Sequence, residues 1–315
     1  MGMPDVSVLM PVYNAERWIG QALGSLLAQQ VDLEVLVLDD SSTDAGAEIA
    51  SGFGDPRVRV VSLPKSGTVG TLNAGLELAR APFLARMDAD DVSAPGRLAA
   101  QLALLLVDPG LTMVGCSYEW IDTQGHRLSV VAPPTRDEDI RRRMHVQMPY
   151  AGGSFFLRAS DVHRVGPYSR DHVAAEDFDL VQRLSRVGRL GSAPQVLYGM
   201  RVHDSNTSSG VREAEQETAS RVLAAVWGAE ELSPLSSAQV RKRAREYAEL
   251  GPDGAAVAAQ FVRTELLLAA ALARRGDRRA ALLTAASVMG APRHAGAVLA
   301  DAPARLREVR RHRTR

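Results

Sequence analysis

The chain has 315 residues and a mass of 33.8 kDa, with 46% hydrophobic and 23% charged residues, as expected for a globular protein of about two domains. Its 37 basic and 37 acidic side chains balance, which argues against a generic nucleic-acid binder held by phosphate contacts. The single cysteine, Cys116, excludes an intrachain disulfide and a thiolate metal cage.

Neither a membrane-spanning segment nor a targeting segment is predicted. Apolar runs such as residues 266–273 are far shorter than the ~20 residues that span a bilayer. Strand-like sequence begins at Val6, which leaves no room for a signal peptide, so a cytoplasmic protein is expected. Residues 305–315 carry six arginines against one glutamate, enough charge for a weak peripheral contact with an anionic membrane; a solvated terminus is the alternative.

The charges are unevenly distributed along the chain. Residues 1–130 hold 16 acidic and 8 basic side chains, so the remaining residues carry the compensating positive charge. An acidic N-terminal half that binds an anionic ligand would need a cation. Arginine and alanine are abundant, and lysine occurs only at positions 65 and 242, which indicates a GC-rich bacterial gene.

The first hundred residues alternate β-branched runs with helical patterns. This order predicts a mostly parallel α/β sheet with helices on both faces, whose ligands lie at the carboxyl ends of the strands. Carboxylates fall at two of these ends, in Asp39-Asp40 and in residues 88–91. The strands are expected at residues 6–12, 33–38, 58–62 and 83–87, and the helices near residues 18–27 and from Thr71 to Ala79, with Gly67 and Gly70 in the preceding loop.

The rest of the chain has a mixed pattern and then a helical one. Strand-like runs at residues 113–120 and 154–157 precede a helix that is expected to begin near Glu176. Beyond residue 210 the sequence predicts several helices, so a domain boundary is placed there. Residues 266–283 resemble one hairpin of a tetratricopeptide-type repeat, but a single unit favours an ordinary helical appendix.

Asp88, Asp90 and Asp91 form the densest group of carboxylates in the first half of the chain. Asp88 and Asp90 stand two apart on a segment expected to be extended, so their side chains would lie on the same side and could hold one hard cation. Mg²⁺ or Mn²⁺ bound by one or two carboxylates together with substrate phosphates fits this pattern. The alternative is that Asp91 or Ser93 caps the helix announced by Pro95.

Four motifs in order carry a family resemblance. Together they resemble the family 2 glycosyltransferases, which have the GT-A fold, invert the anomeric centre and use nucleotide-diphospho-sugars. The likeness covers about residues 5 to 208, so residues 1–210 are interpreted as the GT-A catalytic domain and residues 211–315 as a helical C-terminal region with a basic tail. The motifs are Pro11-Val-Tyr-Asn14, Val37-Leu-Asp-Asp-Ser-Ser-Thr-Asp44, Leu72-Asn-Ala-Gly-Leu-Glu-Leu-Ala79 and Ala85-Arg-Met-Asp-Ala-Asp-Asp91.

The resemblance implies a binding site for the nucleotide and its metal. It places Tyr13 against the nucleotide base, includes Pro11 in the nucleotide-binding site, and implies that Asp40 accepts a hydrogen bond from a uracil-type ring nitrogen. Asp88 would contact the ribose, and Asp90, with Asp88, would bind the Mn²⁺ or Mg²⁺ that bridges the donor diphosphate. For Tyr13, a half-buried core tyrosine is the alternative interpretation.

The resemblance also implies which residue acts on the acceptor. Asp177 corresponds to the general base of the family, and Glu176 and Asp179 are the next candidates. Acidic residues are common in a first helical turn, which is the alternative interpretation for all three. Residues 201–203 resemble the Arg-x-His that follows the last strand in the family, so His203 is a candidate metal or diphosphate ligand.

Two departures from the family pattern bear on the substrate. Residues 148–154 stand where relatives often have a histidine near the acceptor pocket. The identity of the acceptor is therefore not inferred from the family resemblance. Gln182-Arg183 is not followed by the Arg-Trp pattern of processive polysaccharide synthases, so transfer of a single sugar is expected.

The sequence therefore predicts a metal-dependent, inverting hexosyl- or N-acetylhexosaminyl-transferase whose donor is a nucleotide-diphospho-sugar, with a UDP-sugar expected. One alternative is a sugar-1-phosphate nucleotidyltransferase, which would need a glycine-rich basic loop after the first strand where this chain has residues 11–14. The other is a non-catalytic module on a degenerate GT-A fold that binds a nucleotide sugar or a protein partner.

Overall fold

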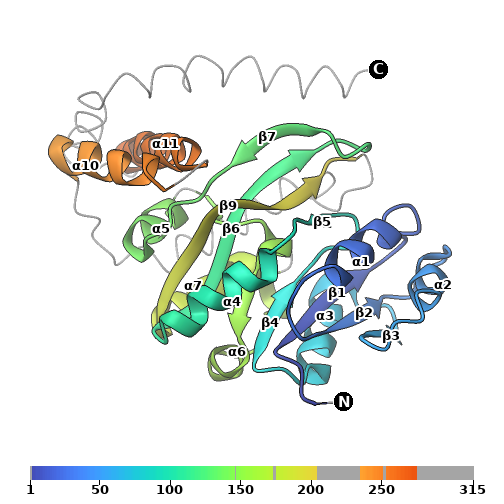
Figure 1. The fold of residues 1–315 in the computed structure, drawn as a ribbon. Helices are drawn as coiled ribbons and strands as arrows, with labels where there is room; N and C mark the ends of the chain where they lie inside the picture. The colour runs from blue at the N-terminus through green and yellow to red at the C-terminus, as the bar shows by residue number, and fades with distance from the viewer. Residues whose placement is uncertain (1, 146, 173–174, 204–234, 251–252, 275–315) are drawn as a thin grey trace. The chain divides into compact units, whose positions relative to one another are not determined.

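The computed structural model describes residues 2–145, 147–172, 175–203, 235–250 and 253–274 (Figure 1). Contacts divide the chain into two compact units, which are described separately. One lies within Met1–Ile140 and Met148–Glu230, and the other within Arg141–Gln147 and Glu231–Arg315. The predicted boundary near residue 210 lies outside the described residues.

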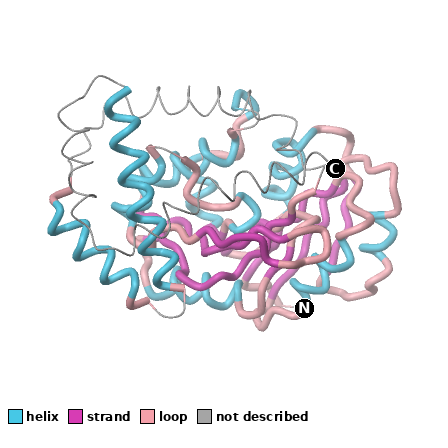
Figure 2. Tube along the Cα trace, turned by 90° about the horizontal axis from the view of Figure 1, so that it is seen from above, coloured by secondary structure: helices cyan, strands magenta, loops and turns pink. Residues whose placement is uncertain are grey.

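The first unit is built on a mixed β-sheet (Figures 1 and 2). Its strand order is β3-β2-β1-β4-β8-β6-β9-β5, with β7 paired to β6. The pairs β3–β2, β2–β1, β1–β4 and β6–β9 are parallel, and the other pairs are antiparallel. The strands are β1 (Val6–Val12), β2 (Leu33–Asp39), β3 (Val58–Ser62), β4 (Phe83–Arg86), β5 (Val92–Ser93), β6 (Leu111–Ile121), β7 (Arg127–Val131), β8 (Phe156–Arg158) and β9 (Arg189–Arg201).

Helices cover both faces of the parallel part of the sheet, which confirms the predicted α/β class. Val8 and Met10 of β1 belong to the same apolar core as the buried leucines of α1 (Ile19–Leu27) and α4 (Arg97–Val107). Leu9, on the opposite face of β1, lies against Gly75 of α3 (Gly67–Leu78). A Cβ on Gly75 would lie 2.5 Å from a methyl of Leu38, so glycine allows α3 to approach the sheet closely.

The remaining helices of the first unit connect or flank the later strands. The helix α7 packs against β6 and β9, and its start at Glu176 is as predicted. These elements are α2 (Gly46–Ser51), α6 (Ala159–Val165), α7 (Glu176–Val187) and the 3₁₀ turns η1 (Gly152–Ser154) and η2 (Arg170–His172). The helix α5 (Asp137–Met144) begins in the first unit, and its residues from Arg141 onward belong to the second.

The predicted start of α3 at Thr71 is wrong, because the helix begins at Gly67. The carboxylate of Asp40 accepts hydrogen bonds from the backbone N–H groups of Ser66 (2.6 Å) and Gly67 (3.1 Å). The first N–H groups of a helix lack partners within the helix. The carboxylate of Asp40, which follows β2, binds these groups and so stabilises the helical turn between Gly67 and Thr71.

The described part of the second unit is helical, as the sequence predicts for the C-terminal region. The helix α10 (Ser237–Ala248) begins with a capping box between Ser236 and Gln239 and packs on α11 (Gly254–Arg274). Arg142 and Glu265 form a buried ion pair in this unit. The end of the repeat-like segment 266–283 and the basic tail 305–315 lie outside the described residues. No helix in the described ranges has the length and apolar character needed to cross a membrane.

Candidate active site

Three loops that carry predicted site residues leave the sheet at one edge. Pro11 and Val12 of β1 are in register with Leu38 and Asp39 of β2, and β4 runs parallel to β1 on its other side. The carboxyl ends of β1, β2 and β4 therefore meet, as the sequence predicts. Tyr13, Asp40 and Asp88 follow these three ends.

The loops after β1 and β2 are bound to each other. The backbone N–H of Asn14 donates to Ser42 Oγ at 3.0 Å, and Asn14 Oδ1 accepts from the Thr43 N–H at 2.8 Å. Asn14 has a positive φ of 53°, a conformation that asparagine tolerates better than most residues. These bonds hold Tyr13 and Asp40 in a fixed arrangement.

Tyr13 is 53% exposed, so it is not the half-buried core residue of the alternative interpretation. The Lys65 ammonium lies 2.9 Å from the centroid of the Tyr13 ring and 3.1 Å from Asp40 Oδ2. Burial raises the pKa of Asp40, but the Ser66 N–H and Lys65 outweigh it and hold the pKa below its ordinary value. Lys65 thus lies against both Tyr13 and Asp40, a contact that the sequence pattern did not indicate.

The segment from Asp88 to Asp91 is a turn, so the predicted extended conformation is wrong. The strand β4 ends at Arg86, and the N–H of Asp91 donates to the carbonyl of Asp88 at 3.2 Å. Burial raises the pKa of Asp88, and the charge of Asp90 in the same turn adds to this shift.

Asp91 anchors this turn and caps no helix. Its Oδ2 accepts from the Tyr198 hydroxyl at 2.5 Å, and its Oδ1 accepts from the N–H of Arg201 at 2.8 Å. The helix α4 starts only at Arg97, after Gly96, and has no side-chain cap. The capping alternative for Asp91 or Ser93 is therefore wrong.

Asp90 and His203 lie side by side although 113 positions separate them. His203 Nε2 is 2.9 Å from Asp90 Oδ2, and Trp18 stacks on the imidazole with the ring centroids 5.9 Å apart. The guanidinium of Arg201 holds the same turn, because its Nε donates to the carbonyl of Asp90 at 2.8 Å. The structure thus brings together two residues predicted as metal ligands.

These residues fit a cation that is shared with a substrate. In the part of the chain that the structure describes, no group of three His, Cys, Asp or Glu side chains could hold a metal ion by itself. Asp90 and His203 offer one carboxylate and one imidazole, with Asp88 in the same turn. Mg²⁺ and Mn²⁺ commonly take one or two protein carboxylates and complete their coordination with phosphate oxygens and water.

Arg86, which the sequence analysis did not single out, connects Asp88 to Asp177. Its Nε donates to Asp88 Oδ1 at 3.0 Å, and its Nη1 donates to Asp177 Oδ1. Burial would lower the pKa of Arg86, but Asp177 and Asp88 raise it well above its ordinary value, so the guanidinium stays charged. One signal was present in the sequence: Arg86 is the charged residue of an otherwise apolar strand, and a buried charge requires a partner.

Asp177 lies at the start of α7, against the 3₁₀ turn η1. Burial raises its pKa to about 6; Arg86 opposes this shift and Glu176 adds to it. A Cβ placed on Gly152 would overlap Asp177 Oδ2 and lie 3.1 Å from Arg86 Nη1. The turn that contains Gly152 therefore borders the predicted base.

The two other base candidates occupy different environments. Asp179 accepts from Arg183 Nε at 2.9 Å and Nη2 at 2.7 Å, and Arg183 also donates to the carbonyl of Gly166 at 2.7 Å. Asp179 thus belongs to a contact that holds the loop before α7. Glu176 Oε2 is buried without a hydrogen-bond partner among the described residues.

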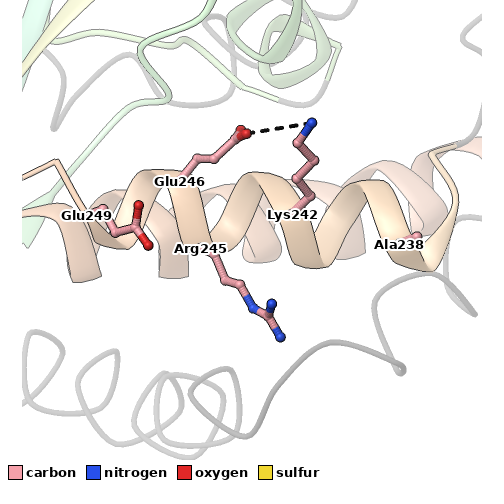
Figure 3. A pocket seen from close by; sticks show the side chains of 5 residues that line it. All are labelled: Ala238, Lys242, Arg245, Glu246 and Glu249. Carbon is pink, nitrogen blue, oxygen red and sulfur yellow. Dashed lines mark ion pairs between the residues drawn. The ribbon is translucent and has the colours of Figure 1, made fainter.

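A shallow hollow of about 340 Å³ lies on α10 (Figure 3). It contains none of the predicted site residues. A Lys242–Glu246 ion pair of 4.0 Å crosses this surface. The hollow is lined by Ala238, Lys242, Arg245, Glu246 and Glu249, all from one helix. We therefore do not consider it a candidate active site.

Relatives of known sequence are glycosyltransferases. A protein of Haemophilus influenzae described as an uncharacterized glycosyltransferase is 29% identical over 233 residues, which cover 70% of this chain and 72% of that protein. The chondroitin synthase of Pasteurella multocida is 29% identical over 217 residues, which are 65% of this chain but 21% of the synthase.

Solved structures show the same fold at lower identity. TarS 1–349 of S. aureus, in complex with UDP-GlcNAc, matches with a TM-score of 0.59 and 18% identity, over 92% of this chain and 93% of that one. The mannosyltransferase PcManGT of Pyrobaculum calidifontis, in complex with GDP-Man and Mn²⁺, matches with a TM-score of 0.56 and 20% identity, over 90% of this chain and 79% of that one.

The family assignment rests on the N-terminal half of the chain, which contains Tyr13, Asp40 and the Asp88–Asp91 turn. Residues 7–166 match the family model Glycosyl transferase family 2. The chain belongs to glycosyl transferase family 2 and is a glycosyltransferase with a GT-A-type α/β fold.

Proposed function

We propose that the chain transfers a single sugar from a nucleotide-diphospho-sugar to an acceptor in one displacement that inverts the anomeric carbon. The observation that carries this proposal is that Arg86 donates hydrogen bonds to both Asp177 and Asp88. Asp177, whose pKa is raised, is thereby connected to the turn that contains Asp90. A UDP-sugar is the first donor to test, because the family resemblance assigns Tyr13 and Asp40 to a uracil-type base, and both residues follow neighbouring strand ends.

On the acceptor side, Asp177 takes the proton. The acceptor oxygen attacks the anomeric carbon while its hydrogen passes to the Asp177 carboxylate, and the bond from that carbon to the diphosphate oxygen breaks. The nucleoside diphosphate leaves with the bonding electrons. Arg86 already binds Oδ1, so Oδ2, which faces Gly152, is the oxygen assigned to the proton.

On the donor side, Tyr13 would provide an exposed ring for the nucleobase. Asp40, whose buried carboxylate also accepts from the Ser66 and Gly67 N–H groups and pairs with Lys65, would accept from the base. Asp90 and His203 would hold Mn²⁺ or Mg²⁺, which supplies positive charge next to the departing diphosphate when bound. Asp91, through Tyr198 and Arg201, keeps the turn that carries Asp90 in place. PcManGT, which was solved with Mn²⁺ and GDP-Man, supports the metal assignment.

A screen of nucleotide sugars tests the proposal before any acceptor is known. Water can take the acceptor position, so release of UDP or GDP is measured in Mn²⁺ and in Mg²⁺ with UDP-GlcNAc, other UDP-sugars and GDP-mannose. Metal-dependent release of UDP is expected. If a folded protein releases no nucleoside diphosphate from any of these donors, the proposal fails, and the non-catalytic binding module becomes the better interpretation.

The rate should depend on pH through Asp177. The carboxylate acts only when ionised, and burial raises its pKa to about 6. The kcat/KM for donor hydrolysis should therefore rise about tenfold per pH unit below that pKa and level off above it. A profile that stays flat across this region, or one whose inflection persists in Asp177→Asn, would contradict the assignment.

Gly152→Ala should impair turnover by displacing Asp177. The added methyl group overlaps Asp177 Oδ2, and a displacement of about 1 Å at a reacting group can cost about 100-fold in rate. Gly24→Ala is the matched control, because Gly24 lies exposed in α1 with no atom within 4 Å of its added Cβ. Equal hydrolysis rates in the two variants would show that Gly152 needs no space for the carboxylate.

A further inference from the structure

Both the backbone and the side chain of Arg86 are fixed by hydrogen bonds. Neutralising the nearby carboxylates would require only the charge of the side chain. Its backbone N–H donates to the Phe155 carbonyl at 2.9 Å, and its carbonyl accepts from Arg97 Nη2 at 2.7 Å. The same Arg97 nitrogen donates to the carbonyl of Gly153 at 2.8 Å, and Arg97 is fully buried. The backbone of Arg86 is thus fixed to the 3₁₀ turn that borders Asp177.

The side chain of Arg86 then reaches two carboxylates on different elements. It is 8% exposed and donates from Nε to Asp88 and from Nη1 to Asp177. Asp88 lies in the turn after β4, whereas Asp177 lies on α7, 89 positions later in the chain. A planar guanidinium presents its donors in a fixed fork, so the two carboxylates keep a fixed separation.

We propose that Arg86 is a positioning residue for sugar transfer, which orients the Asp177 carboxylate and holds it in register with the donor-binding turn at Asp88. This inference rests on the proposed function of Asp177 as the base. Arg86 takes no proton itself. It occupies Oδ1 of Asp177 and so leaves Oδ2 for the acceptor.

Asp177 depends on this contact for its orientation. Within the described residues, no other hydrogen bond reaches its carboxylate. The negative charge of Glu176 repels the carboxylate of Asp177 and would favour its movement away from Glu176. Without the fork of Arg86, the side chain of Asp177 has rotamers that point its oxygens away from the acceptor.

Arg86→Lys separates positioning from charge. Lysine keeps the positive charge, but its single ammonium cannot reproduce the two-pronged contact. Arg86→Ala would remove a buried charge that compensates two partly exposed carboxylates and is expected to be less stable, so it is not the decisive variant. Arg80→Gln is the control, because Arg80 also pairs with a carboxylate, Glu34 at 2.7 Å, but is 62% exposed.

The test is a double-mutant cycle of Arg86→Lys and Asp177→Asn, with UDP release from UDP-GlcNAc, or from the donor found by the screen, as the readout. In the wild-type background, Arg86→Lys should lower kcat by about 10- to 100-fold, with a much smaller change in KM. In the Asp177→Asn background the same substitution should have almost no further effect, because the base that Arg86 is proposed to orient is already removed. Arg80→Gln should hydrolyse the donor at the wild-type rate.

The outcomes separate this inference from the proposed function. If the double variant loses as much activity as the two single losses multiplied together, Arg86 does not act through Asp177. The same holds if Arg86→Lys raises KM and leaves kcat unchanged. Either result overturns the role of Arg86 but leaves the proposed function standing. If Asp177→Asn keeps nearly the wild-type rate, the base assignment fails, and the role of Arg86 fails with it. Thermal melting of each variant shows whether a loss reflects unfolding.

Discussion

Asp177→Asn should lower the turnover of the nucleotide sugar by about 10²- to 10⁴-fold, the usual contribution of general acid–base catalysis. The amide has nearly the volume of the carboxylate but cannot accept the proton of the attacking oxygen. Because a base acts on the acceptor, the affinity for UDP and for the metal should remain nearly unchanged. Hydrolysis kinetics measure the first effect, and calorimetry with UDP and Mn²⁺ measures the second.

Asp161→Asn serves as the control for this substitution. Asp161 lies in the first turn of α6, where its contact with Arg164 is 3.7 Å, so the same chemical change should leave turnover unaltered. If Asp177→Asn keeps near wild-type turnover, the base lies elsewhere, and Glu176, with its unpartnered buried oxygen, is the next candidate. A loss of UDP binding without unfolding would instead place Asp177 in the donor site.

Removal of the metal should have the second large effect. It should weaken binding of the nucleotide, which Asp177→Asn leaves nearly unchanged. Chelation by EDTA, or Asp90→Asn, should weaken UDP binding on the order of 100-fold and abolish most turnover, because Asp90 and His203 are the proposed protein ligands of the metal. The contrast with Asp177→Asn is the internal control, since only the Asp90 variant should lose nucleotide affinity. UDP binding that is unchanged by chelation, with no other nucleotide bound better, would contradict the metal assignment.

Much of the fold was predictable because its signals are local. The strands β1 and β3 occur at the predicted residues, because both are short runs rich in valine. β1 is almost fully buried, whereas β3 is partly exposed at the end of the sheet. β9 was missed although it spans Arg189–Arg201, because Gly191, Pro194 and Gly199 interrupt the strand pattern. Its partner β6 and the rest of the sheet supply the stabilisation that the local sequence lacks.

The sequence indicated candidate residues for the site but not the contacts between them. Strand ends placed Asp40 and Asp88 at one edge, and the family motifs indicated Asp90, Asp177 and His203. The Asp90–His203 contact spans 113 positions, and no local pattern encodes such a pairing. The same holds for Lys65 over Tyr13 and for Arg86 between its two carboxylates, which appear only when the loops are packed together.

The stereochemistry of the released sugar tests the central claim of a single displacement most directly. In UDP-GlcNAc the sugar is α-linked to the diphosphate, so water activated by Asp177 attacks from the opposite face. Proton NMR of freshly released sugar, recorded before the anomers equilibrate, should show the β anomer. Release of the α anomer would mean retention of configuration, and would contradict a mechanism in which one base, Asp177, activates the attacking oxygen.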